Sequence, residues 1–170
     1  TWYQPAEPAW GPVAHGYRFA PGDEADTPID LADGSSITPF ASVVTAAAGA
    51  GGIAASSSDV ARWVRALFGG GVLRADTLGA MLGDVTRTER YHPTVPYGLG
   101  VQSTEVGGRP SLGHSGRLLG FRSVARWLPR ERIAIAVLTN QSRTDPGIIA
   151  RALLKIALRA PDGCACVDRR

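Results

Sequence analysis

The residues best suited to chemistry form a short run, Gly113–Gly116, in which a histidine stands beside a serine between two glycines. A hydroxyl nucleophile with a neighbouring base is the arrangement that many acyl-transfer enzymes use. The run could be a nucleophile elbow, Gly-x-Ser-x-Gly, which needs a helix directly after the serine. Here Arg117 replaces the last glycine, and the residues up to Phe121 lead into a predicted strand. The elbow interpretation therefore fails on both counts.

A self-contained hydrolase that uses Ser115 as nucleophile and His114 as base is disfavoured as well. Adjacent residues on a strand point to opposite faces of the sheet. The two side chains therefore cannot easily form a nucleophile–base pair.

The same run fits the third motif of the penicillin-recognising serine enzymes, Lys-Thr-Gly or its variant His-Ser/Thr-Gly, on an edge strand. Further pieces occur around it in a fixed order: His15–Tyr17, Gly51–Trp63, Tyr97–Gly100, Gly120-Phe121 and Leu138–Asn140. No piece is specific alone. Their order and spacing resemble the C-terminal half of the family of class C β-lactamases, D-alanyl-D-alanine carboxypeptidases and related esterases. The resemblance covers roughly residues 10 to 158.

This resemblance implies roles for four residues of the third motif. His114 takes the place of the motif's lysine or histidine and would help to set the electrostatics of the site. Ser115 would hydrogen-bond the carboxylate or amide of the substrate, and Gly116 would let the backbone approach the ligand closely. The backbone N–H of Arg117 would be one of two oxyanion-hole donors. The resemblance implies no metal and no organic cofactor.

Two further motifs of the family are absent from the sequence. Its nucleophile is the serine of Ser-x-x-Lys, yet the single lysine, Lys155, follows Ala152 at that spacing. Its Tyr-x-Asn motif is missing too, because Leu138 stands two residues before the single asparagine, Asn140. We expect both motifs to lie in a segment upstream of Thr1. The chain alone would then be inactive, and whether it counts as an enzyme by itself stays open.

The resemblance implies a C-terminal fragment of a serine hydrolase that forms an acyl-enzyme from a β-lactam, a peptide or an ester. The expected partners are the missing N-terminal half or a second copy of the chain, besides a small-molecule or peptide substrate. The rival interpretation is a non-catalytic binding or structural unit with the same fold. By resemblance, the location would be periplasmic, secreted or in the cell envelope.

The hydrophobic pattern predicts an α+β fold, in which helices flank an antiparallel sheet, as the C-terminal part of a β-lactamase/transpeptidase-like fold. Residues 1–50 are irregular and rich in proline. Helices are expected within 56–83, where Ser56 is a good N-cap with Asp59 three residues on. Antiparallel strands are expected within 97–140, and a last helix over 145–159. All of 1–170 then belongs to one portion of a domain.

Four strands are expected in the strand-rich region: Tyr97–Val106, Ser111–Gly116, Phe121–Leu128 and Ile133–Thr139. The last of them is an almost continuous apolar run, which is typical of a central strand buried on both faces. Helical spacing of apolar residues predicts the final helix, from about Asp145 to Arg159.

Composition excludes several other classes of function. The net charge is +3, but the basic residues are scattered, so no nucleic-acid-binding stripe is visible. No apolar run reaches the roughly 18 residues of a membrane span. Cys164 and Cys166 have no histidine nearby in the sequence, which argues against a metal site. His15 is expected to be structural, and His92 to lie in an exposed loop.

Overall fold

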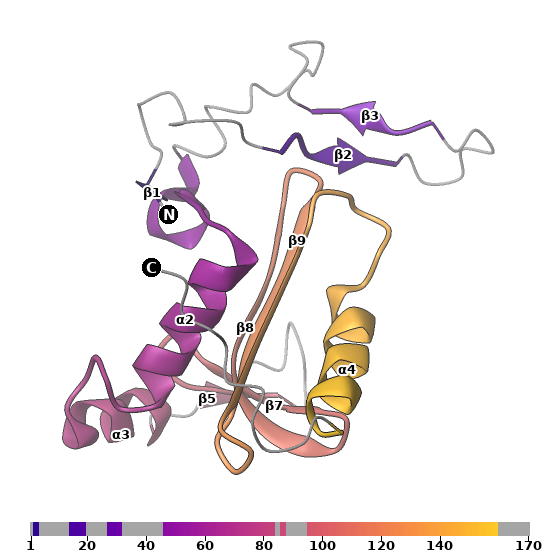
Figure 1. Cartoon of the computed structure of the whole chain (residues 1–170). Coiled ribbons are helices and arrows are strands. Elements are labelled where there is room, and N and C mark those ends of the chain that lie inside the picture. The colour runs from indigo at the N-terminus through magenta and orange to yellow at the C-terminus, as the bar shows by residue number, and fades with distance from the viewer. Residues whose placement is uncertain are drawn as a thin grey trace, which may run out of the picture.

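The computed structural model describes residues 2–3, 14–19, 27–31, 46–83, 86–87 and 95–159. Two short ladders pair β1 (Trp2–Tyr3) with β4 (Ile53–Ala54), and β2 (Tyr17–Arg18) with β3 (Ile29–Asp30). The remaining elements, in order, are η1 (Ala48–Ala50), α2 (Ser57–Phe68), α3 (Ala75–Gly83), β5 (Thr86–Arg87), β6 (Pro96–Tyr97), β7 (Gln102–Val106), β8 (Arg109–Leu118), β9 (Phe121–Leu128), β10 (Ile133–Thr139) and α4 (Pro146–Ala157). Figure 1 shows a tall sheet with a helix on either side and the β2–β3 hairpin above it.

The main sheet has six strands in the order β10-β9-β8-β7-β6-β5, and every neighbouring pair is antiparallel. The strands follow one another as hairpins. The tight turn between β8 and β9 has Leu119 at φ 45° and Gly120 at φ 80°. Two successive positive φ values match the right-handed twist of the strands that they join. Consecutive hairpins of this kind build the long central meander from β8 to β10.

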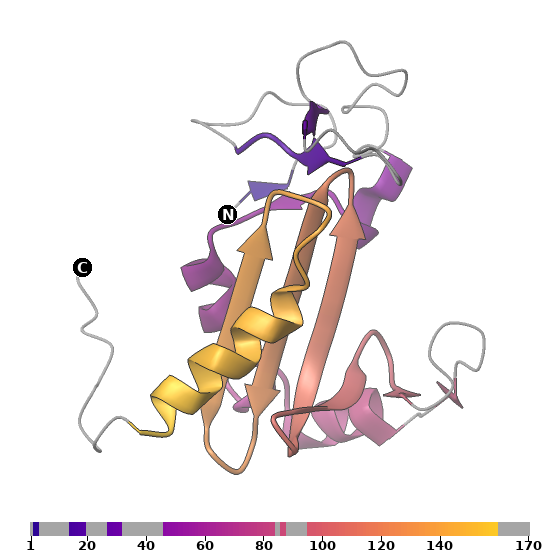
Figure 2. The same ribbon diagram turned by 90° about the vertical axis from the view of Figure 1, so that its right-hand side faces the viewer.

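Helices cover the two faces of this meander (Figures 1 and 2). On one face, Ala150 and Leu154 of α4 join a buried apolar cluster with side chains of the sheet: Val106, Val124, Leu128, Ile135 and Val137. On the other face, α2 packs against β9 and β10, and its C-cap Gly69 lies near the Trp127 ring. The sheet is therefore the middle layer between two helices, and its antiparallel strands with helices packed on them agree with the expected α+β fold.

The start of α2 follows from its sequence. The hydroxyl of Ser56 accepts a hydrogen bond from the backbone N–H of Asp59 at 3.1 Å, and it donates to the Asp59 carboxylate at 2.9 Å. A serine at this position satisfies one of the N–H groups that a helix start leaves free. The expected cap is confirmed.

The apolar run Ile133–Thr139 has the expected bounds. Among the described residues, β10 pairs only with β9, so its other edge is unpaired there. A central place for β10 in a larger sheet stays a prediction. The composition of β10 reflects the helices, since both α2 and α4 pack against it. An apolar composition therefore indicates that the faces of a strand are covered, and it does not indicate whether its edges are paired.

The strand expected over Tyr97–Val106 is two strands. Gly100 takes φ 75°, the N–H of Gly98 donates to the carbonyl of Val101, and the N–H of Leu99 donates to Met81. This tight loop separates β6 from β7. In contrast, the strand expected over Ser111–Gly116 is longer, because β8 continues to Leu118.

The β2–β3 hairpin is fastened to the end of the meander at a contact that we call the hairpin joint, formed by residues 15–17, 119–121 and 140–142. The N–H of Tyr17 donates to the carbonyl of Asn140 at 2.8 Å, and the N–H of Ser142 donates back to Tyr17 at 3.1 Å. A Cβ atom on Gly16 would lie 2.3 Å from the Leu119 carbonyl oxygen. Three pieces of sequence that are distant along the chain therefore meet here.

His15 belongs to this joint. Its Nδ1 lies 2.8 Å from the Asp30 carboxylate, and its carbonyl accepts a hydrogen bond from the Asn140 side chain. The expected structural role agrees with these contacts.

Some expectations fall outside the described residues, namely those for His92, Cys164 and Cys166. In the described part of the chain, no cluster of three or more histidine, cysteine or acidic side chains could hold a metal ion. Within the same part, no helix is both long enough and apolar enough to cross a membrane.

Candidate functional site

The motif Gly113–Gly116 lies where β8 extends beyond its neighbour β7. Pairing between β7 and β8 ends at Gln102 opposite Gly113, whereas pairing between β8 and β9 continues to Leu118. In the described structure, residues 115–118 of β8 thus have a strand on one side only. We call these residues the open edge.

The direction of the backbone groups along this edge follows from the hydrogen bonds. The N–H of Ser115 meets the side chain of Gln102, so it points away from β9. In an antiparallel strand the N–H and C=O of one residue point to the same side, and successive residues alternate. The N–H and C=O of Arg117 therefore also point outward, away from β9. This is the orientation that an oxyanion donor needs.

His114 is held from two directions. Its Nδ1 lies 2.6 Å from the carbonyl oxygen of Ser115, and its Nε2 lies 2.9 Å from the hydroxyl of Tyr97. A carbonyl oxygen only accepts, so the hydrogen of the neutral imidazole sits on Nδ1. Nε2 then accepts from Tyr97, and the two rings meet edge to face with their centroids 5.6 Å apart.

Ser115 has a different set of partners. Its N–H and its hydroxyl both lie within hydrogen-bonding distance of the Gln102 amide oxygen, at 3.2 and 3.1 Å. The His114 ring meets the backbone carbonyl of Ser115 and not its hydroxyl. The two side chains are not arranged as nucleophile and base, as the alternation of strand side chains predicts.

Behind Gln102 lies Arg126, which donates from Nη2 to the same amide oxygen at 2.7 Å. Its guanidinium is buried on the face of the sheet that α4 covers, and burial lowers the pKa of Arg126 to about 10. The group therefore stays charged at neutral pH. Its Nη1 has no hydrogen-bond partner among the described residues.

Gly116 and Arg117 complete the motif. A Cβ atom on Gly116 would lie 2.5 Å from the hydroxyl oxygen of Ser123 on β9, so even a methyl group would displace that side chain. Arg117 is exposed, like His114, Ser115 and Gly116. The motif thus forms an exposed ledge rather than a closed pocket.

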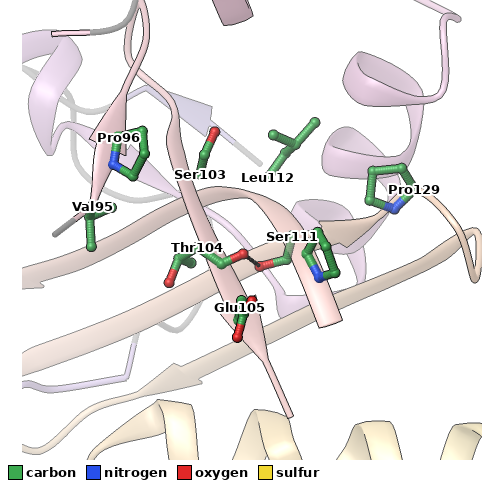
Figure 3. A pocket seen from close by; sticks show the side chains of 9 residues that line it. Val95, Pro96, Ser103, Thr104, Glu105, Ser111, Leu112 and Pro129 are labelled. Carbon is green, nitrogen blue, oxygen red and sulfur yellow. Dashed lines mark hydrogen bonds between the residues drawn. The ribbon is translucent and has the colours of Figure 1, made fainter. Parts of the chain in front are cut away.

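A hollow beside the sheet lies away from the motif (Figure 3). It has a volume of about 590 Å³ and lies around β7 and the first half of β8, with a rim that includes Val95, Glu105 and Pro129. The hydroxyl of Ser111 in this hollow already donates to the carbonyl of Thr104 at 3.1 Å. No residue of the open edge lines the hollow, so we do not place the chemistry there.

The structure brings three residues to the motif that the sequence did not assign to it: Tyr97, Gln102 and Arg126. Tyr97 lies 17 residues before His114, and Gln102 lies 13 residues before Ser115. Arg126 lies 24 residues after Gln102. One signal was available for Arg126, since an arginine among the apolar residues of a buried strand needs a partner. Locating that partner required the register between the strands.

Residues 1–159 match the family model described as beta-lactamase. The chain belongs to the beta-lactamase family. A search of curated proteins finds no match.

Solved structures show the same fold. D-amino acid amidase from Ochrobactrum anthropi SV3, complexed with L-phenylalanine, aligns with a TM-score of 0.67 and 22% identity over 85% of this chain and 45% of that one. Its complex with L-phenylalanine amide gives 0.66 and 23% identity, over 85% and 43%. A D-stereospecific amidohydrolase from Streptomyces sp. gives 0.59 and 24% identity, over 81% and 37%. The chain spans less than half of the length of each of these proteins.

Proposed function

We propose that this chain supplies one wall of the acyl-transfer site of a serine hydrolase, whose nucleophile comes from a polypeptide segment outside this sequence. The observation that carries the proposal is the open edge, on which the N–H of Arg117 points outward three residues after His114. Outward N–H groups of this kind stabilise the negative charge that develops on a carbonyl oxygen during acyl transfer.

In the proposed reaction, the serine of the second wall attacks the carbonyl carbon of the substrate. The carbonyl oxygen, which becomes negative, accepts a hydrogen bond from the N–H of Arg117. Gly116 keeps the strand free of a side chain on one face at this point. The bond between the carbonyl carbon and the leaving group breaks as the proton of the serine hydroxyl passes to that group, which leaves an acyl ester on the serine. Water then hydrolyses the ester, which releases the carboxylic acid and restores the serine hydroxyl.

We propose an amide as the bond that is cleaved, ahead of an ester or a β-lactam. The support is the names of the similar structures, a D-amino acid amidase and a D-stereospecific amidohydrolase. The open edge itself fits any acyl carbonyl, so the amide preference rests on that similarity.

An active-serine probe tests the proposal. We expect the isolated chain to remain unlabelled, because the sequence lacks Ser-x-x-Lys. In the presence of the polypeptide that carries the nucleophile, we expect labelling on that polypeptide and hydrolysis of an amide or ester. Stoichiometric labelling of Ser115 in the isolated chain would contradict the proposal.

We also propose that the N-terminal half of the enzyme covers the outer side of β10 and α4. Apolar side chains are exposed on α4: Ile148 (58% exposed), Ile149 (36%), Leu153 (43%) and Ile156 (66%). Leu138 of β10 (40%) is exposed on the opposite face of the sheet, because Ile135 and Val137 face α4. Full burial of each such side chain stabilises a protein by about 1.5–3 kcal/mol. An unpaired strand edge beside them is also prone to pair with another chain.

A second copy of this chain is the alternative cover for that surface. Native mass spectrometry distinguishes the two, since a homodimer has twice the mass of the chain and a complex with the N-terminal half does not. A monomer with a sharp, reversible thermal transition would show that neither cover is needed.

A non-catalytic binding unit is the second candidate function. It is favoured by the absence of Ser-x-x-Lys and Tyr-x-Asn from the given sequence. This candidate predicts that the complete protein binds ligands at the open edge but is never labelled by an active-serine probe.

A further inference from the structure

The backbone of Ser115 is satisfied on its outward side by two side chains of the same chain. Its N–H donates to the Gln102 amide oxygen at 3.2 Å, and its carbonyl oxygen lies 2.6 Å from Nδ1 of His114. These are the two groups with which an extended ligand would pair if it lay along β8. At Ser115 both are already occupied.

The atom that meets Ser115 is fixed by its other contact. Arg126 has only N–H groups to offer, and its Nη2 lies 2.7 Å from the same side-chain atom of Gln102. That atom must therefore be the amide oxygen. Because this oxygen only accepts, the Ser115 hydroxyl at 3.1 Å must donate to it. All three hydrogen-bonding groups of Ser115 are thus bound within the chain.

The opposite end of the open edge is also closed. The Leu119 carbonyl oxygen lies against Gly16, and Gly120 lies against the backbone of Tyr17, within the hairpin joint. Between Ser115 and this joint, alternation leaves one residue, Arg117, whose backbone groups point outward and are not part of a strand ladder. At about 3.3 Å per residue, the whole stretch from Ser115 to Leu119 is about 13 Å long.

We propose that Gln102 and His114 close the open edge at Ser115, so that a ligand pairs with the backbone of Arg117 alone and gains no affinity from further residues that lie along β8. The inference rests on the proposed function for the place of the ligand, and it adds this limit on backbone pairing. Gln102 is in this view a specificity-determining residue, and Arg126 positions it.

The test measures binding and not turnover, so it remains informative if hydrolysis is never found. The parent ligand is phenylalanine with an acetylated N-terminus and an amidated C-terminus. Longer ligands carry added alanines at either end, to a total of two or four residues. Each ligand is titrated into the 170-residue chain by calorimetry. For the wild-type chain we expect the four-residue ligands to bind within about twofold of the two-residue ligands.

Variants at Gln102 test the cause of the limit. In Gln102→Ala the N–H of Ser115 becomes free, and we expect the four-residue ligands to gain about fivefold to tenfold in affinity, as one added hydrogen bond allows. Gln102→Glu keeps an acceptor for Ser115 and Arg126, so affinity should depend on ligand length as it does in the wild-type chain. Ser103→Ala, next to Gln102 but on the other face of β7, is the matched control and should show the same dependence.

The titrations of the wild-type chain test the proposal even if Gln102→Ala does not fold. Affinity that rises with every added residue in the wild-type chain overturns the proposal, and so does failure of the whole series to bind. A folded Gln102→Ala variant with the wild-type dependence on ligand length also overturns it. If affinity is independent of ligand length in the wild-type chain but no hydrolysis is found with any partner, the proposed function fails and the binding edge stands.

Discussion

The hairpin joint and the open edge lie at the same end of the meander, and both contain a histidine next to a small residue. At the joint, backbone groups pair with one another, because the N–H of Tyr17 donates to the carbonyl of Asn140 and the N–H of Ser142 donates to the carbonyl of Tyr17. At the open edge, no strand in the described part of the chain pairs with the outward groups of Arg117. The two similar motifs therefore differ in whether their backbone N–H and C=O groups can still bind a ligand. This difference distinguishes a structural contact from a candidate site.

The largest effect should come from a side chain in the joint. In Gly120→Ala, the new Cβ would lie 2.7 Å from the Tyr17 nitrogen at a residue with φ 80°. Strain and overpacking together predict a loss of about 2–4 kcal/mol in the free energy of unfolding, measured by urea denaturation. The control is Gly108→Ala, where φ is 76° but nothing lies within 4 Å of the Cβ. Equal losses in the two variants would contradict close packing at the joint.

At the open edge, the comparison predicts lost activity without lost stability. In the active assembly, His114→Ala should lower turnover by about 10²-fold, as the loss of a group that sets the electrostatics of an acyl-transfer site typically does. Because His114 is exposed, the free energy of unfolding should change by less than about 0.5 kcal/mol. Steady-state kinetics and urea denaturation of the same preparation measure both. Wild-type turnover with every accepted substrate would remove His114 from the site.

Tyr97→Phe removes one contact of His114 and should act more weakly. The lost hydrogen bond to Nε2 predicts a fall in turnover of about threefold to tenfold. The edge-to-face contact of the rings is retained in this variant, so the position of the imidazole should persist. A change as large as that of His114→Ala would mean that the Tyr97 hydroxyl acts on the substrate directly.

The smallest effect is expected at the histidine of the joint. His15 and Asp30 form an exposed pair, and such pairs contribute about 0–1 kcal/mol to stability. His15→Ala should lower the free energy of unfolding by no more than that and should leave turnover unchanged. If turnover fell while stability did not, the division between the joint and the edge would be wrong.

Local features of the fold were predictable from the sequence because their causes are local. Ser56 caps α2 through a residue three positions away, and the bounds of β10 follow from its apolar run. The place of β10 at the border of the described sheet was not predictable. The side chains of β10 indicate that helices cover the strand, and none of them indicates whether a neighbouring strand pairs with its edge.

The site was predictable only in its motif. His114 and Ser115 stand together in the sequence, but Gln102 reaches Ser115 only through the register that pairs it with Gly113. A slip of one residue would turn its side chain to the other face of the sheet. Contacts that depend on register across strands cannot be obtained from the composition or spacing of one strand.

The hydrogen bond from Asn140 to the carbonyl of His15 joins residues that are 125 positions apart in the sequence. The β8–β10 meander, in contrast, is held by pairs from adjacent hairpins. Closing a long loop costs more chain entropy than closing a short one, and contacts between distant residues slow folding. The meander should therefore form early and the β2–β3 hairpin should dock last. The end of the strand that carries the site would be completed only at this final step, when most of the sheet is already in place.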